Sequence, residues 1–187
     1  RWADGSVKWL LVDTQADLSP QQHPEVLLEY AETPLVQSRS GGIVLTEDEQ
    51  TITVVTGPLK FIVQKASFDL LHGIWLDRNT DGIFDESERV TGPGELTLQF
   101  RGQTYYSSLD RQTTRVSVEE AGPLRTTLKA TGWYRNERGE PFCQFVVRIQ
   151  AFANQSFVRI YHTWIYTGYP ANLHHYVYEG LKLPENE

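Results

Sequence analysis

The stretch from Asp77 to Glu88, which reads DRNTDGIFDESE, has the side chains and the spacing of a calcium-binding loop. Counted from Asp77, oxygen-bearing side chains recur at the first, third, fifth, ninth and twelfth positions, and Gly82 occupies the sixth, where such a loop turns sharply. Ca²⁺ takes about six to eight hard oxygen ligands in a flexible shell. The pattern therefore predicts Ca²⁺ bound by Asp77, Asn79, Asp81, the backbone carbonyl of Ile83, Asp85 and Glu88.

The flanks of this loop differ from those of a helix–loop–helix calcium site. Gly92, Pro93 and Gly94 follow closely and would stop an exiting helix within one turn. We therefore expect an EF-like loop between strands, in which the ion stabilises the fold and does not signal. The alternative is a solvated acidic turn, because Asn, Asp and Gly form turns without any ion.

The histidines and the single cysteine form no recognisable catalytic arrangement. His162 lies on one face of a β-rich segment, where a half-buried histidine with a hydrogen-bond partner is the alternative to a catalytic one. His174 and His175 lie between a loop and a β-rich segment, with no carboxylate at metal-ligand spacing. Cys143 follows Phe142 in a β-rich segment and is expected to act as a small apolar residue.

The chain is rich in aromatic residues, with five Trp and nine Tyr. Trp133 and Tyr134 are adjacent in a predicted strand, so their rings point to opposite faces of it. Tyr105 and Tyr106 form a second adjacent aromatic pair. Exposed rings of this kind can pack against the apolar face of a sugar. The alternative is that they fill the core or cover the ends of strands.

The elements that must position these residues are strands, because hydrophobicity alternates with a period of two over most of the chain. We expect a strand at 6–13, a hairpin of 50–56 and 59–65 joined by Gly57–Pro58, and strands at 96–100 and 113–119. Three long strands at 124–134, 142–152 and 157–166 should form an antiparallel meander. No segment keeps a helical stripe for as many as ten residues. The fold class is therefore all-β, an antiparallel β-barrel or β-sandwich with long loops.

Composition narrows the choice of function. The 187 residues include 17 Lys and Arg against 24 Asp and Glu, a net charge of −7, which argues against nucleic acid or an anionic membrane as partner. The chain contains no methionine and opens at Arg1-Trp2. We therefore expect residues 1–187 to form a single all-β module, truncated at its N-terminus and followed in the parent protein by a catalytic domain.

Two motifs carry a family resemblance: WADGSVKWLL at 2–11, and a longer one that runs from Phe145–Phe152 through Asn154 to Val158–Ile165. Both resemble motifs of the exo-rhamnogalacturonan lyase family of polysaccharide lyases. The resemblance implies the N-terminal RIFT-related β-barrel of that family, which precedes a helical α/α-toroid catalytic domain. It also implies a secreted or extracytoplasmic parent that cleaves pectic rhamnogalacturonan by β-elimination. None of the family's catalytic residues maps onto a position of this chain.

Three functions follow as hypotheses. The first is a non-catalytic, calcium-stabilised N-terminal β-module of a pectin-type polysaccharide lyase, whose partners are the helical catalytic domain of its own polypeptide and polysaccharide. On this hypothesis the chain is inactive alone and its parent is the enzyme. The second is a freestanding carbohydrate-binding or adhesive β-module. The third is a β-rich hydrolase that uses His162 or the His174–His175 pair.

Overall fold

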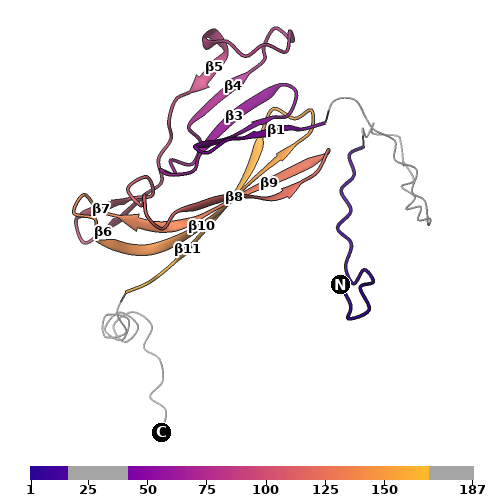
Figure 1. The fold of residues 1–187 in the computed structure, drawn as a ribbon. Helices are drawn as coiled ribbons and strands as arrows, with labels where there is room; N and C mark the ends of the chain where they lie inside the picture. The colour runs from indigo at the N-terminus through magenta and orange to yellow at the C-terminus, as the bar shows by residue number, and fades with distance from the viewer. Residues whose placement is uncertain (17–41, 169–187) are drawn as a thin grey trace, which may run out of the picture.

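The computed structural model describes residues 1–16 and 42–168, which contain eleven β-strands and one short 3-10 helix (Figure 1). The elements are β1 (Val44–Glu47), β2 (Thr51–Val55), β3 (Leu59–Gln64), β4 (Gly73–Leu76), η1 (Glu86–Glu88), β5 (Arg89–Thr91), β6 (Thr97–Phe100), β7 (Gln103–Tyr106), β8 (Arg115–Ala121), β9 (Arg125–Arg135), β10 (Pro141–Phe152) and β11 (Val158–Ile165). Within the described residues no helix has the length and apolar character needed to cross a membrane.

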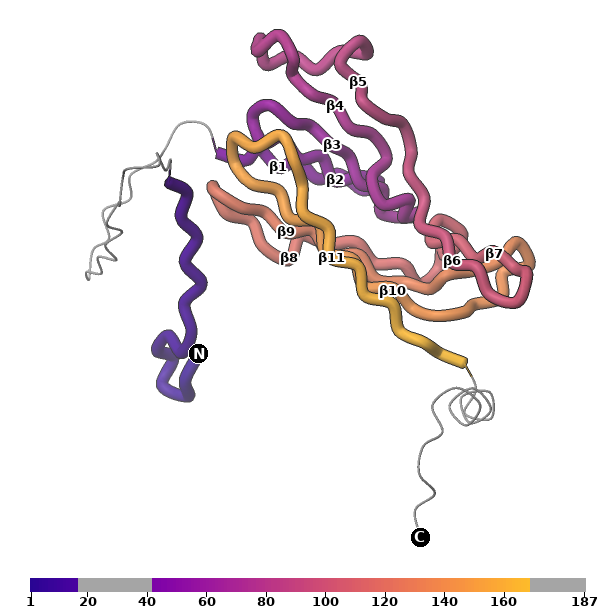
Figure 2. Tube along the Cα trace, turned by 180° about the vertical axis from the view of Figure 1, so that it is seen from behind, coloured from indigo at the N-terminus to yellow at the C-terminus, as the bar shows by residue number. Residues whose placement is uncertain are grey.

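The strands form two antiparallel sheets that lie one above the other, as two opposite views show (Figures 1 and 2). One sheet has five strands in the order β1-β2-β3-β4-β5. The other has six strands, in the order β11-β10-β9-β7-β6, with β8 also paired to β9. The all-β prediction is confirmed, and of the two closures that the sequence left open the protein adopts the β-sandwich.

The β2–β3 hairpin shows why these residues form strands. Gly57 turns the chain with φ at +114°, a conformation that glycine adopts without steric cost. Ile52 and Val54 on β2, like Phe61 and Val63 on β3, are fully buried, and the residues between them are half-exposed. This alternation buries one face of the hairpin against the other sheet.

The predicted meander is present as β9, β10 and β11, with register running from Phe152↔Arg125 to Pro141↔Arg135 and from Ala151↔Val158 to Gln144↔Ile165. The inward residues of β9 and β10 pack against the five-stranded sheet to make one core, whereas β11 is exposed along most of its length. The largest fully buried members of that core are Tyr134, Phe61, Phe68, Phe145, Ile52, Leu128 and Ile149.

The strand predicted at 6–13 does not form. Trp9 is 85% exposed, and the N-terminal segment stands away from the two sheets in both views (Figures 1 and 2). The contacts of this segment with the sandwich lie at its end, where Asp13 pairs with Arg125 and the Gln15 amide donates to the Ala153 carbonyl. Its sequence favours a strand, but no neighbouring strand lies beside it in the described residues to complete a sheet.

Candidate functional site

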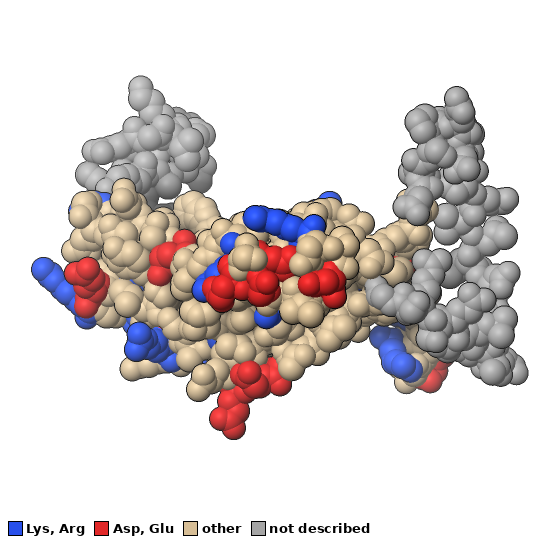
Figure 3. All heavy atoms as spheres, turned by 90° about the horizontal axis from the view of Figure 1, so that it is seen from above, with Lys and Arg blue, Asp and Glu red and all other residues tan. Residues whose placement is uncertain are grey.

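The predicted calcium loop connects β4 to β5 and lies at the top of the molecule in Figure 1. Figure 3 views the protein from that side and shows acidic side chains gathered near the middle of the face, with lysine and arginine close beside them. The loop holds η1, whose N-cap is Asp85. Hydrogen bonds from the Ser87 hydroxyl and amide hold the pKa of the Asp85 carboxyl below its ordinary value.

Backbone N–H groups turn toward the side-chain oxygens along the loop. Gly82, with φ at +76°, donates to Asp77 Oδ2 over 2.9 Å. The amide of Asp81 donates to Asn79 Oδ1 over 3.0 Å, and that of Ile83 donates to Asp81 Oδ1 over 2.7 Å. The loop therefore curls around its own acidic side chains, and Gly82 permits the tightest part of the turn.

The two ends of the loop meet at Glu88. Its Oε1 accepts the backbone N–H of Arg78 over 2.9 Å, although the two residues are ten positions apart. Glu88 is only 4% exposed, and its Oε2 and the Oδ1 of Asp77 are buried without a hydrogen-bond partner. Two buried carboxylate oxygens without donors fit a cation, because an unpaired buried acceptor is costly.

The remaining predicted ligands are not gathered around these two oxygens. Within the described residues no three His, Cys, Asp or Glu side chains converge closely enough to hold a metal ion. Asp81 is bonded to Ile83 and Asn79, and Asp85 is bonded to Ser87. The calcium prediction thus remains a prediction, supported at the first and twelfth positions of the loop.

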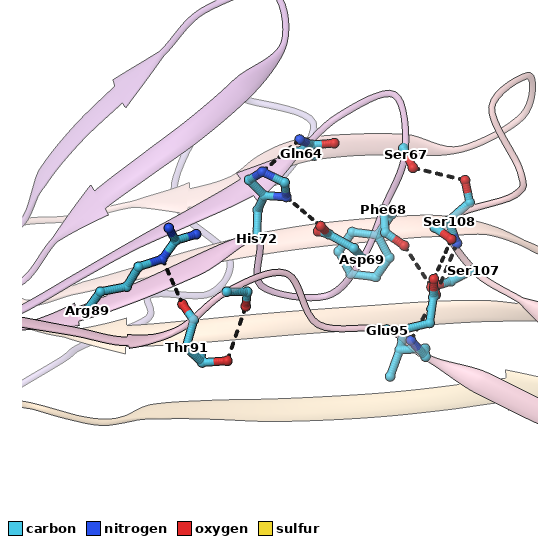
Figure 4. Close-up of polar contacts among 12 residues, drawn as sticks. Gln64, Ser67, Phe68, Asp69, His72, Arg89, Thr91, Glu95, Ser107 and Ser108 are labelled. Atoms are coloured by element: carbon cyan, nitrogen blue, oxygen red, sulfur yellow. Dashed lines mark hydrogen bonds and ion pairs between the residues drawn. The ribbon is translucent and has the colours of Figure 1, made fainter. Parts of the chain in front are cut away.

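A second polar cluster, which the sequence reading missed, lies between β3 and β4 (Figure 4). His72 Nδ1 is 2.6 Å from Asp69 Oδ2, and His72 Nε2 is 3.1 Å from the side-chain nitrogen of Gln64. Nearby, the Ser107 hydroxyl lies 2.7 Å from the Phe68 carbonyl. These bonds tie a turn in which Leu70 has φ at +73°, so the cluster orders the chain between the strands. The Asp-x-x-His spacing is the sequence signal for it.

His162 is hydrogen-bonded to a core tyrosine. Its Nε2 lies 2.7 Å from the Tyr134 hydroxyl, and the rings meet edge to face. Burial raises the pKa of Tyr134 to about 12 and lowers the pKa of His162. The pair is therefore neutral near pH 7. His162 has the hydrogen-bond partner that the structural alternative required, but the residue is exposed and not half-buried.

The other reactive candidates are Cys143, which lies in the core, and two histidines that lie outside the described residues. Cys143 is fully buried, and burial raises the pKa of its thiol, so it acts as an apolar residue as expected. It lies at the irregular start of β10, where the register shifts between Pro141 and Gln144. His174 and His175 lie outside the described residues.

The aromatic candidates separate onto two faces of the six-stranded sheet. Tyr105 is 8% exposed and packs on Phe142 in the core. Tyr106 pairs with Arg135 across β7 and β9, and Trp133 lies two residues before Arg135, so these three side chains share the face turned away from the core. Gln144, which pairs with Trp133, joins them. We call Tyr106, Trp133, Arg135 and Gln144 the outer aromatic face.

Asp110 holds this face in place. One side of Trp133 pairs with Gln144 of β10, but on the other side β7 and β8 leave the backbone of β9 without a strand partner. Asp110 fills the gap, because its Oδ2 accepts the Trp133 N–H and its Oδ1 accepts from Arg135 Nε, both over 2.9 Å. Burial would raise the pKa of this carboxyl, but hydrogen bonds from Thr113, Arg135 and Trp133 outweigh burial and leave it below the ordinary value.

Together, the fold and these sites define an antiparallel β-sandwich module with an acidic loop between two of its strands. The chain belongs to the PcRGLX-like protein family, whose central beta sandwich domain matches residues 43–181. It is thus a module of a rhamnogalacturonan lyase-like protein. No curated protein matches the sequence.

The match confirms the family and adds the position of the module within it. The resemblance implied an N-terminal barrel, whereas the matched domain is the central β-sandwich, in agreement with the two-sheet fold. The motif at 2–11 lies ahead of the matched residues, and the second motif, on β10 and β11, lies within them.

Proposed function

We propose that this chain is a non-catalytic, calcium-stabilised module of an extracytoplasmic rhamnogalacturonan lyase-like protein, which supports a catalytic domain elsewhere in the same polypeptide. The observation that carries the proposal is the family match over the whole described sandwich. The extracytoplasmic location rests on the family resemblance alone.

We propose that the module is not catalytic because of the contacts that its best candidate, His162, makes. His162 is bonded to Tyr134, and no carboxylate lies within hydrogen-bond distance of His162 in the described residues. Proton abstraction from a sugar needs a base within reach of the substrate and a group that stabilises the developing charge. In this pair the Nε2 of His162 is already engaged by the Tyr134 hydroxyl, and the neutral pair supplies no cation to stabilise the developing charge.

Calcium is proposed at Asp77, Asn79, Asp81, the Ile83 carbonyl, Asp85 and Glu88. The buried, unpaired oxygens of Asp77 and Glu88 support the two ends of this set. The other ligands would join by releasing the loop's own N–H groups, which are exposed and can bond to water instead. The ion would relieve the repulsion among the carboxylates and brace the connection between β4 and β5.

Strand β11 supports the second part of the proposal, that the module packs against the rest of its own polypeptide. Ile160, His162 and Trp164 pair with the buried β10 residues Ile149, Val147 and Phe145, so they continue the core face of the sheet. Yet Ile160 is 39% exposed and Trp164 is 57% exposed. An apolar edge strand of this length favours coverage by protein, and the neighbouring domains of a central module are the occupants we propose.

The test is a cleavage assay. The chain and its longer parent are incubated with rhamnogalacturonan, and unsaturated products are followed by ultraviolet absorbance. We expect turnover by the parent only. Turnover by the chain that is lost in His162→Gln, with circular dichroism unchanged, would show that the module is itself catalytic and would overturn the proposal.

The alternative, a freestanding carbohydrate-binding or adhesive module, is favoured by the half-exposed rings of Tyr106 and Trp133 on one face. It differs from the main proposal in whether β11 needs a covering domain. A chain that stays monomeric and does not bind the separately expressed flanking domains would favour it.

A further inference from the structure

The outer aromatic face is the feature that the proposed function leaves unexplained. The rings of Tyr106 and Trp133 lie on neighbouring rows of one sheet face, and both are half-exposed. Neighbouring strands are about 4.8 Å apart and next-nearest residues along a strand about 7 Å apart, so the two rings can contact successive units of one ligand.

The surface around these rings is hollowed. One depression of about 300 Å³ beside Trp133 is lined by Thr131, Trp133, Gln144, Val146 and the adjoining Thr113. A second depression, also about 300 Å³, lies beside Tyr106 and extends to Asn136 and Arg138. A third, of about 330 Å³, lies beside Arg135 and is lined also by Arg111. The residues lining all three adjoin the outer aromatic face, so the hollows lie around it.

Arginines surround the rings in a protein that is acidic overall. Arg138 lines the hollow beside Tyr106, and Arg111 lines the hollow beside Arg135. Arg115 pairs with Thr131, which lines the hollow beside Trp133. None of these three has a carboxylate partner within the described residues, whereas Arg135 is held by Asp110. Glu137 is the one acidic side chain among the linings of these three hollows. The net charge of the chain is −7, so this cationic surplus is local.

Hydrogen-bonding groups on the same face are unused. The side-chain amides of Gln144 and Gln150 and the indole N–H of Trp133 make no hydrogen bond to other described residues. Gln150 lies on the outward side of β10, as Gln144 does. Amides, a ring face and a free guanidinium are the groups that recognise hydroxyls, sugar C–H surfaces and carboxylates respectively.

We propose that the outer aromatic face binds an acidic polysaccharide, a sugar chain that carries carboxylates. The rings of Tyr106 and Trp133 stack on successive sugars, Gln144 bonds to hydroxyls, and Arg111 and Arg138 pair with carboxylates. The proposal deepens the function proposed above, because a lyase-like protein that acts on rhamnogalacturonan gains from a non-catalytic surface that retains its polymer.

The test is calorimetric titration of the chain with uronate-containing rhamnogalacturonan oligosaccharides, beside the same oligosaccharides with carboxyl groups reduced to alcohols. We expect binding that weakens with salt, and weaker binding of the reduced ligand. Trp133→Ala and Gln144→Ala should each weaken binding by about tenfold or more, equivalent to about 1.4 kcal/mol. Arg111→Ala should weaken binding and flatten its salt dependence. Trp9→Ala and Arg89→Ala, which change an exposed ring and an arginine elsewhere, are the matched controls and should bind normally.

Equal binding of the reduced and unreduced ligands would overturn the acidic class of ligand. Absence of binding to both, or unchanged binding by Trp133→Ala and Gln144→Ala, would overturn the site. Self-association of the chain that Gln144→Ala abolishes would also overturn it, since the face would then join two copies. Each of these results leaves the cleavage assay unaffected, so the proposed function stands or falls separately.

Discussion

Asp77 Oδ1 and Glu88 Oε2 are both buried and both without a hydrogen-bond partner, at the two ends of the loop that joins β4 to β5. The other oxygen of each carboxylate is bonded to a backbone N–H of the loop, from Gly82 and Arg78 respectively. Each carboxylate is therefore held in place by one oxygen, and its other oxygen is buried and unpaired. A bound cation explains this arrangement better than a solvated turn, which would leave its oxygens in water.

We predict that Ca²⁺ raises the melting temperature of the chain. At about one hundred times the dissociation constant, the ion should add about 2.7 kcal/mol to the free energy of unfolding, or about 5–10 °C. Scanning calorimetry with millimolar Ca²⁺ and with a chelator measures the difference. Mg²⁺ should replace Ca²⁺ poorly because it demands a tight octahedron and keeps its waters.

The variants Asp77→Asn and Glu88→Gln should abolish the calcium-dependent shift while the fold is retained. Glu49→Gln, at an exposed acid outside the loop, is the matched control and should keep the full shift. Identical transitions with Ca²⁺ and with chelator in the unaltered chain would contradict the calcium site.

We predict that Asp110→Asn lowers the free energy of unfolding. The variant should also lose less of that free energy than the unaltered chain does when the pH is made acidic. Breaking the buried pair with Arg135 should cost about 3–5 kcal/mol, measured by urea unfolding. The folded pKa of Asp110 is lowered, so its contribution is complete above the ordinary carboxyl pKa and is lost as pH falls through the folded pKa. The matched control is Glu119→Gln at the exposed pair with Arg148, which should cost about 1 kcal/mol or less. Equal costs for the two variants would contradict the role given to Asp110.

Sequence periodicity located the long strands well. β9, β10 and β11 are eight to twelve residues long, so the sequence of each spans several periods of two. In β9 and β10 this appears as alternating buried and half-buried side chains, whereas β11 is exposed along most of its length. β4, β5 and β7, with three or four residues each, are too short to show a period, and none was predicted. Residues 6–13 show the opposite error, because a strand-like sequence forms a strand only when a partner strand is present.

The candidate sites were predictable to different degrees. A calcium loop is a local pattern, so the spacing from Asp77 to Glu88 was enough to predict one, and the site stays a prediction. The outer aromatic face depends on register, since only the pairing of Tyr106 with Arg135 decides that Tyr106 points outward and Tyr105 inward. Asp110 was missed because its role arises from a gap between β7 and β8, which no local pattern encodes.

We predict that His162 titrates below the ordinary histidine pKa of about 6.5, because partial burial beside Tyr134 disfavours its charged form. The unfolded chain then binds a proton that the folded chain resists, so stability falls as pH drops below the ordinary value. Titration of the ring by NMR measures the pKa directly. His162→Gln should flatten the stability profile between pH 5 and pH 7 relative to the unaltered chain, and a pKa above 6.5 would contradict the prediction.

The last prediction concerns Gly132, which lies on the inward side of β9 opposite Phe145. A Cβ added at Gly132 would lie 2.7 Å from Phe145 Cζ and 2.7 Å from Thr114 Oγ1. Phe145 is fully buried, stacks on Phe68 and meets Tyr134 edge to face, with both ring centroids 5.4 Å away, so it has little room to move. Gly132→Ala should therefore lower the free energy of unfolding by about 1–3 kcal/mol, measured by urea unfolding. Gly92→Ala, whose Cβ would meet only the end of the Arg89 side chain at 3.7 Å, is the matched control and should be nearly neutral. Phe145→Leu alone should also destabilise the core. In the double variant, however, the smaller leucine side chain leaves space for the added Cβ at position 132, so the loss of stability should be less than the sum of the two single losses. Full additivity of the two losses would show that Gly132 and Phe145 do not compete for the same space.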